Sequence, residues 1–534
     1  MASSPIAAVL IAIAVAISPQ RGWIAAAPFL LGWLAAPVFA YLLSQPRVQR
    51  RRALTAQERA QVRRLARRTW HYFEVLVGPD DHWLPPDNFQ ETPQPTLARR
   101  TSPTNIGIGM LATLAARDLG YITTRELVDR IGHTLDTCDR LERHEGHLLN
   151  WYDTSTLAPL WPRYVSTVDS GNFVTSLVTM ASALDELAVR PAAATRLVDG
   201  LVDTATVVRD LTSGSGAWTP EDAAAVEKLE AAASRVLAAL RTRTQDAAAL
   251  SSLTSTAITD VDAALAVATT TPIIEWARAL RSALDRVAPR SPVVAEDQAD
   301  DERRAETAAL LELAQRCRAL VAEMHFGFLY DRTRHLFSIG YRLADADGPG
   351  VLDNSFYDLL ASEARLASFI AIARGHVPQR HWFHLGRRAI SVDGMPTLLS
   401  WSATMLEYLM PSLLMRSFPE TLLDTTNHGA VARQASYARQ RHVPWGISES
   451  AYNVRDRYDN YQYKAFGVPG LGFKRGLADD LVIAPYATAL ALAVNPQAAL
   501  RNFTRLTAAG AEGRFGYYEA VDYTPRKSPD PDDA

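Results

Sequence analysis

Glu449 has mostly apolar and aromatic neighbours in the sequence, which is unusual for a charged residue. Glu449 is part of WGISESAYN, residues 445–453, with Trp445 and Tyr452 close to it in the chain. A carboxylate among apolar side chains is costly to bury unless it is paired or has a function. The alternative interpretation is that Ser448 caps a helix and that Glu449 occupies its first turn, where the helix dipole stabilises a negative charge.

A second glutamate, Glu363, lies in a segment, residues 353–375, that we expect to be helical. Leu359 and Leu366, four residues before it and three after it, place it on the apolar face of such a helix. Burial raises the pKa of a carboxyl group, and a general acid that works near neutral pH requires a raised pKa. The alternative is a buried ion pair with Arg365 or with another arginine.

The neighbours of both glutamates favour carbohydrate chemistry. A pair of carboxylates on either side of a glycosidic bond is the minimum that glycoside hydrolysis or transfer requires. Aromatic faces offer apolar surface on which sugar rings can stack, and nearby acids and amides can bind the hydroxyls. Around the two glutamates, the candidate sugar contacts are Asp353, Tyr357, Trp401, Trp445, Tyr452, Tyr461 and Tyr463.

An aromatic and polar loop, residues 144–174, supplies a second group of candidates. NWYDT and VDSGN within it contain Trp151, Asp153, Asp169 and Asn172, which we expect to contact the same sugar. The alternative is that Trp151 packs in the core and that Asp169 caps a helix.

Composition excludes several other classes of function. The chain has 534 residues and a net charge of −3, without the basic stripe that a nucleic-acid-binding protein carries. Its two cysteines, Cys138 and Cys317, form no metal-binding cluster, and neither an HExxH motif nor a phosphate-binding loop is present. We therefore expect no metal, no cofactor and no nucleic-acid partner.

The N-terminal region, residues 1–52, predicts a membrane anchor. Residues 22–44 are uncharged and long enough to span a bilayer. The arginine-rich segment RVQRRR, residues 47–52, predicts that the following chain lies on the cytoplasmic side of a bacterial inner membrane. A signal peptide is the alternative, but the first five residues lack the basic side chains of its n-region.

The rest of the chain alternates helices with aromatic, glycine-containing loops, which is typical of an all-α protein with an (α/α)6 toroid fold. Residues 53–173 form the first part of this predicted domain and residues 326–534 the second, catalytic part. Between them, residues 174–325 are rich in alanine and poor in aromatic residues, which predicts a helical insertion outside the toroid.

The longest motifs are RLERHEGHLLNWYDTSTLAPLWPRYVSTVDSGNF, YDLLASEARL and WGISESAYN. With them the sequence resembles the middle, glucoamylase-like region of cyclic β-1,2-glucan synthases, over roughly residues 60–525. The resemblance implies a retaining transglycosylation that closes linear β-1,2-glucan into a ring. It assigns the acid/base to Glu363 and the nucleophile to Glu449. It also implies partner regions in the same synthase, namely a membrane glycosyltransferase and a phosphorylase-like part.

Two other interpretations stay open. One is an inverting endo-β-1,2-glucanase, in which water is the attacking group and the two carboxyl groups lie about 6.5–9.5 Å apart instead of about 5 Å. The other is a membrane-anchored module that binds glucan without catalysis, which requires aromatic subsites but yields no product.

Overall fold

The computed structural model divides into two compact units, one of residues 1–53 with 418–421 and one of the remaining chain. It describes residues 3–17, 23–43, 52–190, 195–214, 218–241, 247–288, 296–346 and 348–525. All but the last residue of the arginine-rich segment 47–52 lies outside the described residues.

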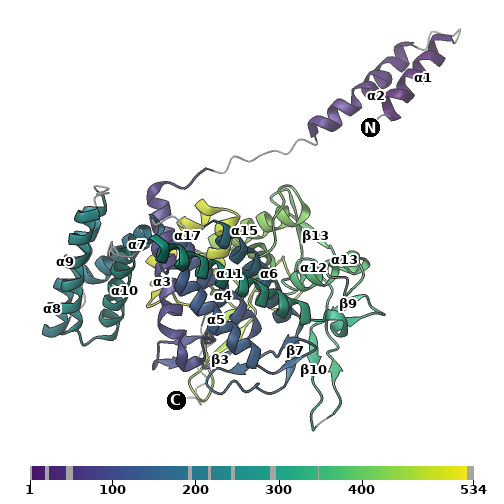
Figure 1. Cartoon of the computed structure of the whole chain (residues 1–534). Coiled ribbons are helices and arrows are strands. Elements are labelled where there is room, and N and C mark those ends of the chain that lie inside the picture. Colours follow the sequence, from purple (N-terminus) through teal and green to yellow (C-terminus); the bar gives the residue numbers. More distant parts are fainter. Residues whose placement is uncertain are drawn as a thin grey trace. The chain divides into compact units, whose positions relative to one another are not determined.

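The N-terminal unit contains two apolar helices, α1 (Ser3–Ile17) and α2 (Trp23–Leu43), which pack against each other (Figure 1). Among the described helices, one is long and apolar enough to cross a membrane, and it spans Trp23–Leu42. Its large side chains are mostly exposed, as Ile24 and Phe29 illustrate. This helix coincides with the segment that the sequence predicts as an anchor.

The larger unit is mostly helical, and its helix ends follow the capping signals of the sequence. Thr55 and Thr123 each form a capping box with the glutamate three residues later, and Gly120 ends a helix at a φ of 84°. Apart from the inserted helices described below, its α-helices are α3 (Ala56–Leu76), α4 (Pro103–Leu119), α5 (Thr124–Arg140), α6 (Thr167–Val189), α11 (Glu296–Glu323), α12 (Arg365–Ala373), α13 (Arg380–His384), α14 (Met405–Leu409), α15 (Leu422–Gln440), α16 (Pro485–Leu490) and α17 (Pro496–Ala508).

Short antiparallel strands lie in the connections between these helices. The paired strands are β1 (Phe89–Gln90) with β2 (Thr96–Leu97), β3 (Arg100–Thr101) with β6 (Tyr152–Asp153), β4 (Arg143–His144) with β5 (His147–Leu148), β10 (Gly340–Arg342) with β7 (Tyr164–Ser166) and β11 (Val351–Leu352), β9 (Leu336–Ser338) with β8 (Tyr330–Asp331) and β12 (Phe356–Tyr357), β13 (Ala389–Val392) with β14 (Met395–Leu398), β15 (Ser450–Arg455) with β16 (Tyr461–Lys464), β17 (Val482–Ile483) with β20 (Val521–Asp522), and β18 (Glu512–Gly513) with β19 (Gly516–Tyr517). Strands β8 and β9 form a hairpin, in which Tyr330 pairs with Phe337.

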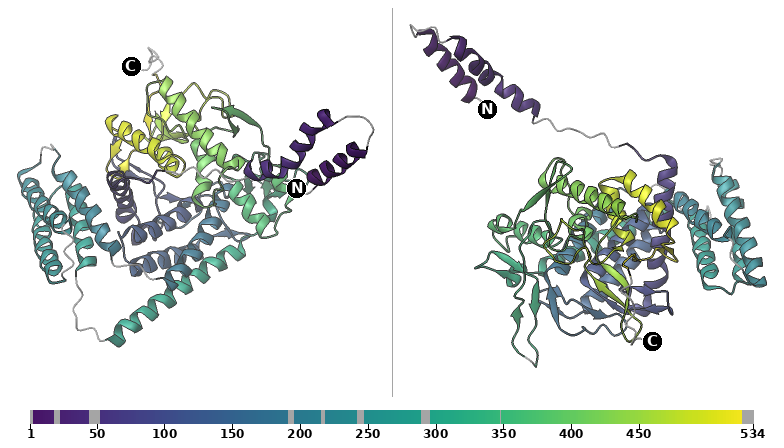
Figure 2. Two further views of the ribbon diagram at one scale, coloured as in Figure 1. Left: turned by 90° about the horizontal axis from the view of Figure 1, so that it is seen from above. Right: turned by 180° about the vertical axis from the view of Figure 1, so that it is seen from behind.

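Four inserted helices form a bundle with its own hydrophobic core (Figures 1 and 2). They are α7 (Thr195–Thr212), α8 (Pro220–Arg241), α9 (Ala247–Leu265) and α10 (Thr271–Val287). The bundle contacts the main body through α3 and α5, where Arg63 pairs with Asp203 (2.8 Å) and Arg286 with Glu126 (2.7 Å). The boundary predicted at residue 174 falls inside α6, which belongs to the core of the main body.

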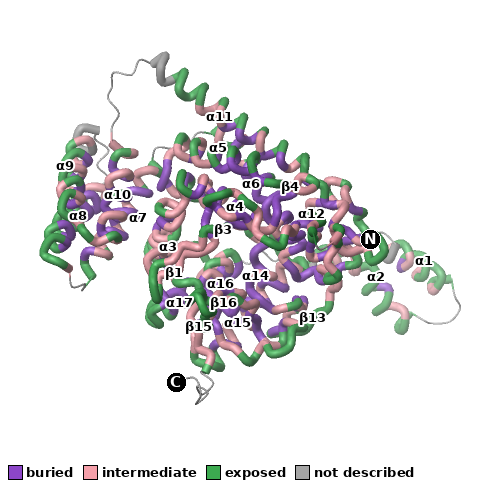
Figure 3. Tube along the Cα trace, turned by 90° about the horizontal axis from the view of Figure 1, so that it is seen from below, coloured by how far each residue is buried: buried purple, intermediate pink, exposed green. Residues whose placement is uncertain are grey.

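The main core lies between α4, α5, α6, α11 and α12, and its burial is visible in Figure 3. Helix α6 packs on both α11 and α12. At Gly171 the two helix backbones approach so closely that an added Cβ would lie 2.7 Å from the Ala367 nitrogen. This contact fixes α12, and therefore the segment that precedes it, against the core.

One helix that the sequence predicts is shorter than expected. The helix predicted over residues 353–375 begins only at Arg365, because β12 and a turn occupy its first half. Glu363 therefore precedes the helix instead of lying on its apolar face. Glu449 is also outside any helix, immediately before β15, so the alternative interpretation, in which Ser448 caps a helix, is wrong.

The approach of α6 to α12 generates a stability prediction. Gly171→Ala should lower the free energy of unfolding by about 1–3 kcal/mol, because the new methyl group overlaps the α12 backbone. Gly132→Ala on α5 is the matched control. Its methyl group would meet only Leu313 Cδ2 at 3.9 Å, so stability should rise by up to about 1 kcal/mol. Urea unfolding measures both, and equal effects of the two substitutions would contradict the close approach.

Candidate active site

Glu363 and Glu449 line the same cavity, although 85 residues of chain lie between them. The cavity has a volume of about 610 Å³. Its walls come from the hairpin β8–β9, from β12 and the turn after it, from the loop before α14, and from the end of the segment before β15. Its lining residues are Arg334, Leu336, Ile339, Ser355, Phe356, Tyr357, Asp358, Ser362, Glu363, Trp401, Ser402, Thr404, Glu407 and Glu449.

Glu363 is held by its neighbour Arg365, whose guanidinium is buried. Arg365 does not form the ion pair with Glu363 that the alternative interpretation required. It donates to the carbonyl oxygens of Ser362 (3.0 Å), Glu407 (3.0 Å) and Tyr408 (2.7 Å), which joins the turn that carries Glu363 to α14. The positive charge nevertheless lies close enough to oppose, in part, the rise in the pKa of Glu363.

Both glutamates have raised pKa values for the same two physical reasons. Burial raises the pKa of Glu363 well above its usual range, and the charges of Glu449, Asp169 and Glu407 raise it further. Burial and then the charges of Glu407, Asp169 and Glu519 raise the pKa of Glu449 to about 7. Carboxylates this close cannot all ionise together, so the pair titrates as a unit. The pair therefore releases its protons at a higher pH than ordinary glutamates do.

Glu407 is a third carboxylate in the cavity wall. It completes the capping box of α14 with Thr404, and it also accepts hydrogen bonds from Ser400 Oγ (2.9 Å) and the Ser402 nitrogen (3.1 Å). These bonds shape the loop that carries Trp401. Trp401 is 47% exposed, and its indole nitrogen donates to Asp358 (2.7 Å). The loop thus presents a fixed aromatic face at the cavity, as stacking on a sugar requires.

A hydrogen-bond network connects the candidates of the loop 144–174 to the start of α6. Thr104 Oγ1 donates to Asp169 (2.6 Å) and accepts from the buried amide of Asn172 (3.1 Å). Asn150, with its amide oriented to satisfy both neighbours, donates to Asp169 (3.1 Å) and accepts from Trp151 (3.3 Å). The Trp151 ring also lies under the guanidinium of Arg100. Asp169 is close enough to raise the pKa values of both Glu363 and Glu449.

The predicted sugar contacts divide into residues that line the cavity and residues that do not. Tyr357 and Trp401 line it beside the two glutamates. The candidates outside its lining are Trp151, Asp153, Asp169, Asn172, Asp353, Trp445, Tyr452, Tyr461 and Tyr463.

Several candidates outside the lining have other contacts. The Asp153 and Asp353 carboxylates accept backbone N–H groups two residues further on, as turn residues do. Trp445 is 3% exposed and packs in the core. Tyr452 packs edge-on against Phe466.

The aromatic rings of the hairpin β15–β16 follow directly after Glu449. Tyr463 is 63% exposed and is paired with Ala451, two residues from Glu449. Tyr461 is 36% exposed, at the start of β16.

Sequence reasoning did not select Glu407, Arg334 or Glu519. Glu407 follows Thr404 by three residues before an apolar run, a pattern that predicts only a capping box. Arg334 lies in the turn of a hairpin, where a charged residue is ordinary. Glu519 accepts a hydrogen bond from the Ala451 nitrogen (2.9 Å), and no spacing in the sequence connects those two positions.

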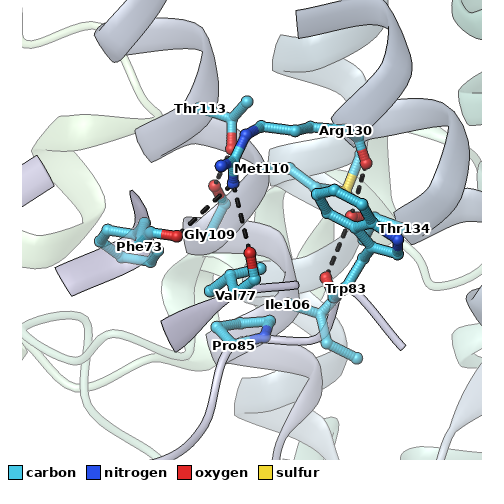
Figure 4. Close-up of a pocket in the computed structure, with 10 residues that line it drawn as sticks. All are labelled: Phe73, Val77, Trp83, Pro85, Ile106, Gly109, Met110, Thr113, Arg130 and Thr134. Atoms are coloured by element: carbon cyan, nitrogen blue, oxygen red, sulfur yellow. Dashed lines mark hydrogen bonds between the residues drawn. The ribbon is translucent and has the colours of Figure 1, made fainter. Parts of the chain in front are cut away.

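A second, much smaller pocket lies between α3, α4 and α5, with a volume of about 10 Å³ (Figure 4). Arg130 crosses it and donates to the carbonyl oxygens of Phe73 and Val77, while Thr134 donates to that of Trp83 (Figure 4). The space holds no more than one water molecule. It is a packing gap closed by Arg130, not a substrate site.

Comparison with protein families and structures defines the class of this chain. Residues 355–530 match the Glycoamylase family, described as "Putative glucoamylase". An endo-β-1,2-glucanase from Chitinophaga pinensis, solved with sophorotriose and glucose, has a TM-score of 0.50 at 12% identity, over 88% of each chain. An endo-β-1,2-glucanase from Talaromyces funiculosus, solved with sophorose, has a TM-score of 0.52 at 11% identity, over 87% of this chain and 80% of the other. These likenesses confirm the predicted helical toroid fold.

The comparison with curated proteins is more specific. The chain is 39% identical over 521 residues to the cyclic β-(1,2)-glucan synthase NdvB of Rhizobium meliloti (strain 1021). The match covers 94% of this chain and 18% of the length of NdvB. The chain is therefore related to a portion of cyclic β-(1,2)-glucan synthases, which confirms the resemblance drawn from the sequence motifs.

The raised pKa values predict that the two glutamates reduce stability at neutral pH. Below the ordinary pKa of glutamate, native and unfolded chains both hold the proton. Above it, the unfolded chain releases a proton that the native site retains, so native stability falls as the pH rises through the native pKa. Glu449→Gln and Glu363→Gln should each raise the melting temperature. The gain should be small at about pH 5 and correspond to about 1 kcal/mol or more at about pH 8.

Asp331→Asn is a control of opposite sign. The backbone N–H groups of Arg334 and Thr333 lower the pKa of Asp331, so its removal should lower the melting temperature at both pH values. Thermal melts followed by circular dichroism measure all three variants. A loss of stability at alkaline pH in both glutamine variants would contradict the raised pKa values.

Proposed function

We propose that this chain is the cyclising transglycosylase region of a cyclic β-1,2-glucan synthase and that it acts by retention. The single observation that carries the proposal is the cavity with Glu363 and Glu449 in its wall, in a chain 39% identical to NdvB. The different rises in pKa support different roles. Glu363 keeps its proton and serves as the general acid, while Glu449 is the group that ionises and serves as the nucleophile.

The proposed reaction has two displacements. Glu449 attacks the anomeric carbon of a β-1,2-linked glucosyl unit while Glu363 protonates the departing glycosidic oxygen, which leaves a glycosyl ester on Glu449. The 2-hydroxyl at the non-reducing end of the same glucan then attacks the anomeric carbon. Glu363 takes its proton, and Glu449 departs as a carboxylate. The ring closes with the β configuration restored, and no water is consumed.

We also propose the placement and the subsites. The apolar helix Trp23–Leu42 anchors the chain in the bacterial inner membrane, with the catalytic unit on the cytoplasmic side. Trp401 and Tyr357 contact the glucan in the cavity. The negative charge of Asp169 contributes to the raised pKa of Glu363. A glycosyltransferase and a phosphorylase-like part of the same synthase are the proposed partners.

The direct test is incubation with linear β-1,2-glucan. Mass spectrometry should detect products that are lighter by one water than linear glucan of the same length. Linear fragments alone, with a first product of α configuration, would refute the proposal and favour the inverting endo-β-1,2-glucanase. Binding of glucan without any product would favour the non-catalytic module.

The two roles predict different failures of the two variants. Glu449→Gln should abolish both cyclisation and hydrolysis, because no glycosyl ester can form. Glu363→Gln should still be glycosylated by a β-glucosyl donor with a good leaving group, and should then stall for lack of a base. Azide, which needs no base, should release a β-glucosyl azide from that variant.

Nuclear magnetic resonance identifies the configuration of the azide adduct. An α-glucosyl azide from the Glu363 variant would reverse the assignment of the two roles. Rescue of neither variant, with both folded, would refute the proposed pair.

A further inference from the structure

The segment that ends in Glu449 has no regular secondary structure, although it is almost wholly buried. Residues 444–448 are buried and belong to neither a helix nor a strand. Buried backbone N–H and C=O groups need hydrogen-bond partners, and among the described residues no strand pairs with this segment. The question is therefore which groups hold the backbone that carries the proposed nucleophile.

One buried carboxamide pairs with the backbone of Trp445. Asn502 on α17 donates to the Trp445 carbonyl oxygen (2.7 Å) and accepts from the Trp445 nitrogen (3.1 Å). Its amide also donates to Thr488 Oγ1 (2.8 Å). Asn502 is 1% exposed, so these bonds form away from water.

A second buried carboxamide repeats this arrangement two residues later. Gln434 on α15 donates to the Ile447 carbonyl oxygen (2.7 Å) and accepts from the Ile447 nitrogen (2.8 Å). Gln434 is also 1% exposed. A carboxamide presents one donor and one acceptor in a single plane, so it can replace a peptide group of a neighbouring strand. Two such side chains, from two different helices, thus take the place of a strand partner.

The residues between and after these pairs are also fixed. The Gly446 carbonyl oxygen accepts from the Ala484 nitrogen (2.9 Å), and the φ of Gly446 is 132°, a value that favours glycine. The Tyr486 hydroxyl lies 2.8 Å from both Ser448 Oγ and the carbonyl oxygen of Glu449. The Glu449 side chain remains as the group that reaches the cavity wall.

We propose that Gln434 and Asn502 form an amide clamp, defined as their paired hydrogen bonds to Ile447 and Trp445, that positions Glu449. Gln434 is the positioning residue nearer to Glu449, and Asn502 anchors the start of the segment. The inference rests on the proposed function for its kinetic consequence, but not for the clamp itself. An apolar side chain at position 434 would leave the Ile447 nitrogen without its partner, and it would leave the Ile447 carbonyl oxygen with only the longer hydrogen bond from the Met405 nitrogen (3.4 Å).

A neutral side chain is also required at position 434. A carboxylate there could not donate to the Ile447 carbonyl oxygen, and it would add charge to a site that already holds Glu449 and Glu407. Titratable or charged side chains come from α15 and from α14, the helix that packs against it. Glu407 is on α14, and Arg433 and Tyr437 are on α15, next to position 434 and one turn after it. Arg433 donates to the carbonyl oxygen of Pro469.

The test is Gln434→Glu, with Asn427→Asp as its matched control. Asn427 is on the same helix and is 4% exposed, and its amide donates to Ser412, away from the cavity. At neutral pH, Gln434→Glu should lower kcat about 100-fold, with KM changed much less, because the nucleophile is misplaced. As the pH falls, the ratio of variant kcat to wild-type kcat should rise, because a protonated carboxyl group again donates to Ile447 and accepts from it.

A purely structural role would not give this pH-dependent ratio at temperatures well below the melting point. Gln434→Met, similar in shape but without the donor, should show the same loss of kcat and no recovery at low pH. If Gln434→Glu does not fold, Gln434→Met serves as the test variant in its place. Wild-type kcat in Gln434→Glu at neutral pH, a loss no larger than that of Asn427→Asp, or a ratio independent of pH would overturn the proposal.

Hydrogen exchange separates the clamp from the proposed function. The Ile447 and Trp445 amides should be protected in the wild-type protein, and the Ile447 amide should exchange faster in Gln434→Met but not in Asn427→Asp. If the wild-type protein gives no turnover of β-1,2-glucan, the proposed function fails. The hydrogen-exchange comparison then still tests whether the clamp exists. Equal exchange in wild type and Gln434→Met would overturn it.

Discussion

Carboxylates that share a buried cavity repel one another, and the fold has to hold them together against that repulsion. Glu363, Glu449 and Glu407 line one cavity, and Asp169 lies close enough to shift the pKa of the first two. In the part of the chain that the structure describes, no guanidinium forms an ion pair with any of these groups, and Arg365 donates to carbonyl oxygens instead. Burial, together with this excess negative charge, raises the pKa of Glu363 well above that of an ordinary glutamate.

The two glutamates occupy irregular backbone, and each is fixed by side chains from helices nearby. Arg365 ties the turn of Glu363 to α14, and Gln434 and Asn502 bind the backbone just before Glu449. Helices alone could not provide this arrangement, because a helix presents side chains only at its own fixed spacing. The helices are rigid supports, and buried polar side chains on them form hydrogen bonds that fix the positions of the two short segments.

The sequence was sufficient for the helical fold and for the selection of Glu363 and Glu449 as unusual carboxylates. The insertion predicted over residues 174–325 contains the bundle α7–α10, but it also includes most of α6 and all of α11, which pack in the main core. The sequence was not sufficient for the local structure of the two glutamates. Apolar spacing at Leu359 and Leu366 suggested a helix through Glu363, but strand pairing of Tyr357 with Phe337 occupies the first half of that segment. Such pairing depends on a residue about 20 positions away in the chain, which local periodicity does not report.

The same limit applies to the candidate sugar contacts. Tyr357 and Trp401 line the cavity, whereas Trp445, chosen for its closeness to Glu449 in the chain, is buried in the core. Closeness in the chain does not say which way a side chain points when the backbone is irregular. A different reason explains why Glu407 was not selected. Its spacing from Thr404 is fully accounted for by a helix capping box, so the sequence contains no sign of a second role.

The inserted bundle has a consequence for how the chain folds. Helices α6 and α11 pack on each other, yet the whole of α7–α10 lies between them in the chain. A flexible connection of that length would carry an entropic cost when its ends are brought together. Because neighbouring helices of the bundle contact one another and share their own core, the connection can order itself through local contacts. A folded insertion therefore shortens the effective loop, and the long-range pairing of α6 with α11 becomes a comparatively local event.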